Sequence, residues 1–126
     1  MIKGIHHIAI KAKSSEYEKL VWFYEDLLGM KRVRSWNGGV MLSTGDNSVM
    51  ELMCDDNVTI TNDGALRHIA FTTDLVDELI EKIKENGFEV IDEPKDITIQ
   101  AEQPYPVRIA FCKGVVGEVI EFFKEY

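Results

Sequence analysis

Two histidines and two glutamates are the residues of this 126-residue chain whose types suit shared chemistry. His7 and His68 lie in short apolar runs that alternate as β-strands do, and Glu51 and Glu121 lie in two further runs of this kind. A carboxylate among apolar strand residues costs free energy unless it is paired, and a bound cation removes that cost. Two imidazoles and two carboxylates suit one divalent metal ion, Ni²⁺, Zn²⁺, Co²⁺, Fe²⁺ or Mn²⁺, better than Ca²⁺. Four such ligands leave about two positions open on a six-coordinate ion, as catalysis requires.

Each of these residues also has an ordinary interpretation when it is taken alone. A single histidine on a half-buried strand is usually a hydrogen-bonded core or surface residue, and a single glutamate near a strand end usually faces solvent. His6 replaces His7 as the inward residue if the strand register shifts by one position. The metal hypothesis therefore depends on the four residues occurring at matching places.

An internal repeat supplies that match. The matching segments, in pairs, are 7–10 with 68–71, 28–30 with 86–88, and 50–52 with 120–122. Internal repetition determines the architecture of a chain, and each half reads as a strand, a helix and three further strands. We therefore expect an α+β fold of two tandem βαβββ modules within one domain spanning residues 1–126. Module 1 covers about 1–54, a polar linker about 55–65, and module 2 about 66–126.

The expected helices have local start and stop signals. The first is predicted over 17–28, with Ser14 or Ser15 as its cap and Gly29 at its end. The second is predicted from Asp74, as its cap, through residue 86. The strands are predicted at 5–12, 30–36, 39–43, 48–53, 66–72, 88–91, 107–112 and 119–123. Pro94 is expected to stop the strand at 88–91, and 97–105 is either a strand or a long loop.

Composition and charge exclude several classes of partner. The net charge is −8 and the basic residues form no long stripe, so nucleic acid and anionic membranes are not expected partners. The first residues lack the apolar core of a signal peptide, and no run is long enough to span a bilayer. Cys54 and Cys112 are too few to imply a disulfide framework. We expect both to be reduced, buried thiols in a cytoplasmic protein.

Five stretches give the chain a family resemblance: 6–10, 22–30, 49–52, 67–70 and 117–122. On these it resembles the vicinal oxygen chelate (VOC) superfamily of glyoxalases, bleomycin resistance proteins and dioxygenases, and is most similar to glyoxalase I. The resemblance covers essentially the whole chain. It implies curved mixed sheets that form a cup around one metal ion, and it implies a homodimer.

The resemblance also implies a lactoylglutathione lyase-like reaction on a small 2-oxo compound or a thiol hemithioacetal. A proton is abstracted beside a carbonyl and the enediolate is stabilised. By family position Glu121 is the base, and Glu51 is its symmetric partner and mainly a ligand. Two departures leave the thiol open: Lys11 stands where glutathione-type enzymes often have arginine, and 113–117 replaces the Asp-Pro-Asp-Gly turn of the family.

The predicted substrate-lining residues are Lys11, Trp36, Met53, Tyr105 and Phe111. Each aromatic or methionine among them is also a candidate for plain core. Tyr105 lies between two prolines on a predicted loop that could close over the site. Two other functions stay open: an epimerase or other metalloenzyme of the superfamily acting on a different small carbonyl compound, and a non-enzymatic drug-binding resistance protein.

Overall fold

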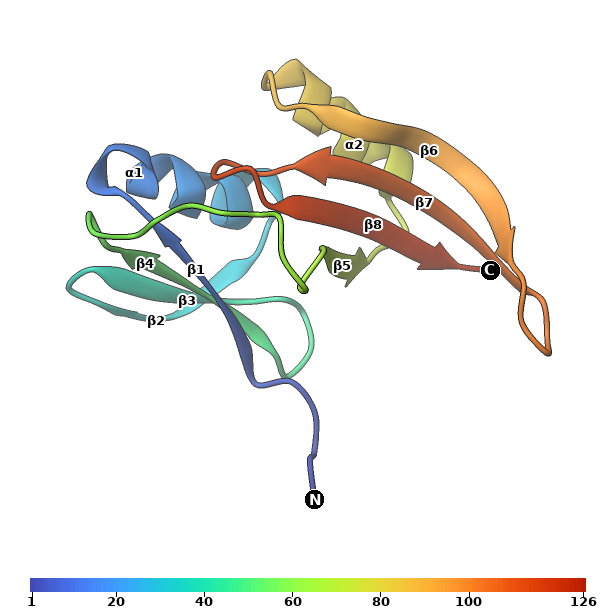
Figure 1. The fold of residues 1–126 in the computed structure, drawn as a ribbon, viewed down its shortest axis with the longest axis horizontal. Helices are drawn as coiled ribbons and strands as arrows, with labels where there is room; N and C mark the ends of the chain where they lie inside the picture. Colours follow the sequence, from blue (N-terminus) through green and yellow to red (C-terminus); the bar gives the residue numbers. More distant parts are fainter. The chain divides into compact units, whose positions relative to one another are not determined.

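The computed structural model describes residues 1–126, and the chain divides into two compact units, Met1–Ile60 and Thr61–Tyr126. The boundary falls inside the predicted linker at 55–65. Each unit contains one four-stranded sheet and one helical segment (Figure 1), which confirms the α+β class and the tandem βαβββ modules. No helix is long and apolar enough to cross a membrane.

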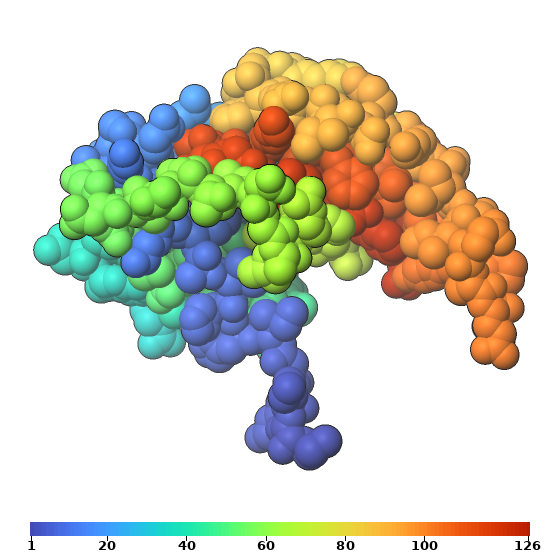
Figure 2. All heavy atoms as spheres, viewed as in Figure 1, coloured from blue at the N-terminus to red at the C-terminus, as the bar shows by residue number.

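The first unit is built on a sheet in which β1 runs parallel to β4 and the other neighbours are antiparallel. Its elements are β1 (His7–Ala12), α1 (Ser14–Trp22), η1 (Phe23–Leu27), β2 (Lys31–Trp36), β3 (Gly39–Ser43) and β4 (Val49–Cys54). The strand order is β1-β4-β3-β2. Residues 1–5 precede this sheet as an extended arm (Figure 2), and Met1 and Ile2 are exposed.

The core of the first unit lies between its sheet and its helical segment. Alternate side chains of β3 and β4, Val40, Leu42, Met50 and Leu52, are at most 1% exposed. They share one face because side chains alternate along a strand. Glu51 lies between Met50 and Leu52 on β4, so its side chain points to the opposite face of the sheet. The helix therefore covers one face and leaves the other for the candidate site.

The start of α1 differs from the prediction. The helix begins at Ser14 rather than at 17, and neither Ser14 nor Ser15 caps it with a side chain. Instead, the Ser14 backbone N–H donates to Asp56 Oδ1 at 2.7 Å. A carboxylate is a good acceptor for the free N–H groups at a helix start. The prediction failed because Asp56 is 42 positions away along the chain.

The end of the first helix is a π-helical turn over Phe23–Leu27. A π-helix has more residues per turn than an α-helix. Three residues of this turn, Phe23, Tyr24 and Leu27, are buried. Gly29 then ends the helical segment with φ +75°, as predicted.

The second unit repeats the topology of the first. Its elements are β5 (Ile69–Thr72), α2 (Val76–Glu85), β6 (Val90–Ile99), β7 (Tyr105–Lys113) and β8 (Val119–Glu125). The order is β5-β8-β7-β6 with β5 parallel to β8, the counterpart of β1 beside β4. Buried Val76, Ile80 and Ile83 of α2 join Ile120 and Phe122 of β8 in its core.

The predicted cap of α2 is wrong. The helix begins at Val76, and no side chain caps it at the preceding residue. Thr73 Oγ1 accepts the Leu75 backbone N–H at 3.0 Å, so this hydroxyl organises the turn that leads into the helix. Gly87 follows the helix with φ +79°, as predicted.

The prediction that Pro94 stops a strand is also wrong, because β6 runs through it to Ile99. β6 is an edge strand that pairs only with β7, and the register shifts between Asp92 and Lys95. Proline is tolerated at an edge or a bulge, where its missing N–H breaks no ladder bond. The turn after β6 (orange) projects beyond the rest of its own unit in Figure 2.

The long β6–β7 hairpin is fastened to α2 by charge pairs. Arg108 on β7 donates from Nε and Nη2 to the Asp77 carboxylate, both at 2.7 Å, and from Nη1 to Asp96 at 3.1 Å. Tyr126 also donates to Asp96 at 2.5 Å. The Arg108 hydrogen bonds lower the pKa of Asp77.

The two cysteines are free but not equally buried. Cys112 is fully buried, and this burial raises the pKa of its thiol to about 12. Cys54 is half-buried, so the prediction of a buried thiol is wrong at this position.

Candidate functional site

The first unit brings His7 and Glu51 together across its parallel strand pair. In the register of β1 and β4, Ala9 is the partner of Glu51, and His7 lies two residues earlier on the same face. His7 Nε2 is 4.0 Å from Glu51 Oε1. The histidine side chain is 44% exposed and the glutamate side chain 17%. The pair therefore sits at an accessible edge of the sheet, on the face that α1 does not cover.

The second unit builds the same pair from β5 and β8. Ala70 is the register partner of Glu121, and His68 lies two residues before it. His68 Nε2 is 3.0 Å from Glu121 Oε2, a direct hydrogen bond. Phe111, the register partner of Glu121 on β7, meets the His68 ring edge to face at 5.3 Å. Of the predicted lining residues, Phe111 thus lies directly beside this pair.

The electrostatics of the second pair favour a protonatable carboxylate. Glu121 is 7% exposed, and burial raises its pKa, while the charge and hydrogen bond of His68 oppose that rise. The balance is a raised pKa. A carboxylate in this state accepts a proton more readily than an exposed one.

The chemistry of the donors fits a divalent cation of the nitrogen-and-oxygen class. Each unit offers one imidazole nitrogen and one carboxylate, which is half of a two-histidine, two-carboxylate set. No group of three or more His, Cys, Asp or Glu side chains that could hold a metal gathers in the structure. Each module therefore supplies one histidine–glutamate pair and no larger cluster of such side chains.

Trp36 and Met53 lie on the Glu51 face of the first sheet. Gly39 is the register partner of both, and register partners point to the same side. The Trp36 indole covers Gly39 so closely that an added Cβ would fall 2.4 Å from its ring. Trp36 thus has its place on this face because residue 39 is glycine.

Lys11 shares that face but already has a partner. Its Nζ donates to Asp55 Oδ2 at 3.1 Å, just beyond the end of β4. It reaches an anionic ligand only by leaving or sharing that carboxylate.

Tyr105 is not on a loop, which corrects the prediction. It is the first residue of β7; its hydroxyl donates to Glu125, and its ring stacks on Phe123 at 6.0 Å. It lies six residues from Phe111 along an extended strand, about 20 Å at 3.4 Å per residue. Tyr105 shares the face of the His68–Glu121 pair but lies at the far end of the strand.

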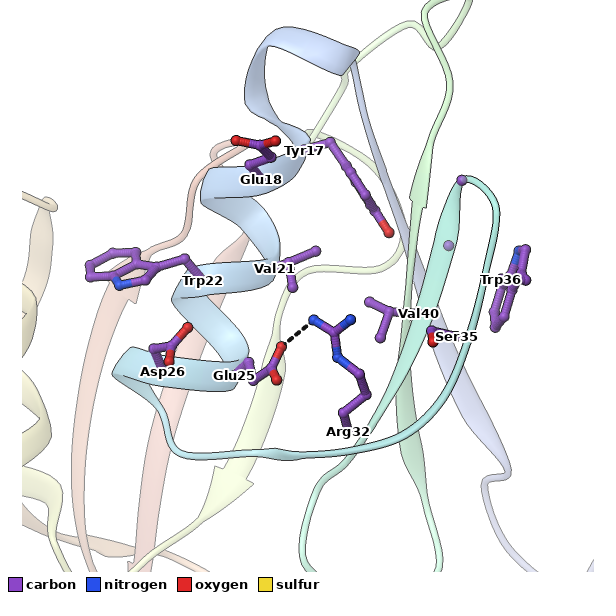
Figure 3. A pocket seen from close by; sticks show the side chains of 12 residues that line it. Tyr17, Glu18, Val21, Trp22, Glu25, Asp26, Arg32, Ser35, Trp36 and Val40 are labelled. Carbon is purple, nitrogen blue, oxygen red and sulfur yellow. Dashed lines mark hydrogen bonds and ion pairs between the residues drawn. The ribbon is translucent and has the colours of Figure 1, made fainter.

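A feature that the sequence analysis missed is a pocket of about 450 Å³ in the first unit, between α1 and the β2–β3 hairpin. Arg32 reaches into it from β2 and binds Glu25 of the π-helical turn at 2.5 Å (Figure 3). Tyr17 lines it and donates to the Leu52 carbonyl at 3.4 Å, and burial raises the pKa of this phenol. Of the predicted substrate-lining residues, Trp36 contributes to the wall of the pocket, whereas Glu51 does not line it. The walls come from the first helical segment and from the β2–β3 hairpin, and no local sequence pattern predicts that these segments pack together.

Comparison with known proteins identifies the class of protein to which this chain belongs. Residues 4–103 match the model of the Glyoxalase/Bleomycin resistance protein/Dioxygenase superfamily, and the chain belongs to that family. This confirms the resemblance to the superfamily that the sequence indicated.

Individual relatives agree with the family assignment. The chain is 33% identical over 99 residues to the uncharacterized protein YwkD of Bacillus subtilis, covering 71% of this chain and 76% of that protein. A glyoxalase family protein from Enterococcus faecalis has a similar structure, with a TM-score of 0.70, 24% identity, and coverage of 96% and 97% of the two chains. A glyoxalase/dioxygenase from Nostoc punctiforme is also similar in structure, with a TM-score of 0.76 and 17% identity, and the match covers 98% of this chain and 92% of that chain. At these identities the solved structures show the shared fold.

Proposed function

We propose that this protein is a divalent-metal-dependent lyase or isomerase that removes a proton beside a carbonyl group. Its substrate is a small 2-oxo compound or the hemithioacetal that such a compound forms with a thiol. The observation that carries the proposal is the repeated pair: in each module a histidine and a glutamate from neighbouring parallel strands face one another, at 4.0 Å and 3.0 Å.

His7, Glu51, His68 and Glu121 are the residues that would hold the cation. When bound, a divalent cation supplies positive charge that offsets the negative charge developing on the substrate oxygens. Proteins of this superfamily bind small molecules and commonly dimerise, and we include a homodimer in the proposal.

Glu121 is the proposed base. Its raised pKa suits it to take the proton from the carbon beside the carbonyl and to return it to the neighbouring carbon. In the metal-free protein, His68 Nε2 lies 3.0 Å from one carboxylate oxygen of Glu121, which holds the two proposed ligands of this module side by side. Glu51, whose side chain is more exposed and farther from its histidine, is the better candidate for a ligand role.

Apolar groups beside the pairs would exclude water from the reacting carbon. Phe111 contacts His68, and Met53 follows Glu51 by two residues on the same face. Shielding of this kind strengthens electrostatic interactions with the developing charge. Because Lys11 is engaged by Asp55, we do not assign glutathione as the thiol.

The test compares Glu121→Gln with a matched control, Glu125→Gln, four residues along the same strand. Elemental analysis of natively purified protein is expected to find stoichiometric divalent metal. Metal-loaded protein is then assayed on methylglyoxal with a panel of thiols, in D₂O. We expect deuterium in the product, a loss of about 10²–10⁴-fold in kcat for Glu121→Gln, and little change for Glu125→Gln.

Absence of both bound metal and proton exchange would contradict the proposal. Deuterium exchange on another carbonyl compound, without hemithioacetal turnover, would instead indicate an epimerase-type reaction at the same residues.

A further inference from the structure

His6, the residue immediately before β1, places its ring against that of His7. The two Nδ1 atoms are 3.0 Å apart, and the rings meet edge to face with centroids 5.2 Å apart. A hydrogen bond between two imidazole nitrogens needs one nitrogen that carries a proton and one with a free lone pair. The contact therefore couples the tautomer of His7 to that of His6.

The other nitrogen of His7 is not engaged in the same way. Its Nε2 is 4.0 Å from Glu51 Oε1, beyond hydrogen-bonding distance. If His7 Nδ1 carries the proton and donates to His6, Nε2 has a free lone pair. That lone pair is on the nitrogen nearest Glu51, where a cation would be bound.

We propose that His6 is a positioning residue that accepts the His7 Nδ1–H and so holds His7 in the tautomer whose Nε2 can bind the metal. The inference rests on the proposed function, because it concerns the same ligand. Metal-binding histidines generally donate their second ring N–H to an outer acceptor, usually a carboxylate, carbonyl or water. In this module the acceptor is a second imidazole.

The second module has a different arrangement. Arg67 occupies the position of His6, and its guanidinium binds Asp63 at 3.1 Å rather than the neighbouring histidine. His68 Nε2 lies 3.0 Å from Glu121 Oε2, so in this module it is the Nε2–H tautomer that can donate to the carboxylate. In the proposed tautomer, His7 Nε2 already has a free lone pair for a cation. An Nε2–H tautomer of His68 would have to move its proton before Nε2 could bind one.

The tautomers can be read directly, because the chain contains only three histidines. The sample is the full, metal-free chain labelled with ¹⁵N in histidine, and the measurement is a long-range ¹H–¹⁵N ring correlation at pH 8.5. We expect His7 as the Nδ1–H tautomer and His68 as the Nε2–H tautomer. Three variants follow: His6→Phe keeps a ring without nitrogen, His6→Asn keeps an acceptor near Nδ1, and Arg67→Phe is the matched control.

His6→Phe is expected to convert His7 to a mixture of tautomers, His6→Asn to preserve the Nδ1–H form, and Arg67→Phe to leave His7 unchanged. In Zn²⁺ titrations, His6→Phe should weaken binding about 10–100-fold and His6→Asn should recover most of that loss. His6 is exposed, so thermal melting should show all variants folded.

An Nε2–H tautomer for His7 in the unchanged protein, or a His7 spectrum unaffected by His6→Phe, would overturn the inference. If no form binds Zn²⁺ while His6→Phe still alters the His7 tautomer, the proposed function fails and the positioning role stands.

Discussion

Replacing Phe122 with alanine should remove a large share of the stability of the second unit. Phe122 lies on β8 next to Glu121 and points to the opposite face, and it is 1% exposed. Its register partners are Phe71 and Ala110, so the ring packs in the middle of the sheet. Because the side chain is fully buried, Phe122→Ala loses its whole transfer free energy and leaves a cavity, about 3–5 kcal/mol. A domain typically has about 5–15 kcal/mol in total.

The assay is urea unfolding of the metal-free protein, followed by far-UV circular dichroism and by tryptophan fluorescence. Both tryptophans lie in the first unit, so fluorescence reports on that unit while circular dichroism reports on both. If the two units unfold together, both signals shift by the same amount in Phe122→Ala. If they unfold separately, only the circular dichroism shifts.

The matched control is Leu66→Ala, in the same unit at a side chain that is 94% exposed. It should change the free energy of unfolding by no more than about 0.5 kcal/mol. A loss below about 1 kcal/mol for Phe122→Ala, close to that of the control, would refute the burial of Phe122 in the core of the second unit.

Three further predictions concern the second unit. Arg108→Met removes the cation that lowers the pKa of Asp77. Because that folded-state pKa lies below the ordinary value of 3.8, the stability difference from the unchanged protein should be full above about pH 5 and shrink as the pH falls below 4, measured by urea midpoints. Cys112, whose pKa is raised to about 12, should not react with a thiol reagent at pH 8 until urea unfolds the chain. Half-buried Cys54 should react first, so the count of labelled thiols should rise from one to two on unfolding. Gly114→Ala would place a Cβ 2.3 Å from the buried Glu118 carboxylate and should lower the melting temperature, whereas Gly64→Ala, in open space, should not.

The four candidate residues, and the fact that they stand at matching places in the two halves of the chain, could be predicted from the sequence. His7 and His68 lie in matching apolar runs, and so do Glu51 and Glu121, whereas the strand register that puts each histidine on the face of a glutamate came from the structure. Alternation and helical spacing are properties of neighbouring residues, so a single sequence displays them directly. The glycine ends of both helices were predictable for the same reason.

Contacts between distant residues were decided only by the tertiary structure. The cap of α1 comes from Asp56, 42 positions beyond Ser14, and Pro94 is accommodated because β6 lies at the edge of its sheet. The burial that raises the pKa of Glu121, and the difference between 4.0 Å and 3.0 Å in the two pairs, depend on how whole strands pack. Alternation along a strand fixes the face of a side chain, whereas the pairing of strands fixes its neighbours and its distance from them.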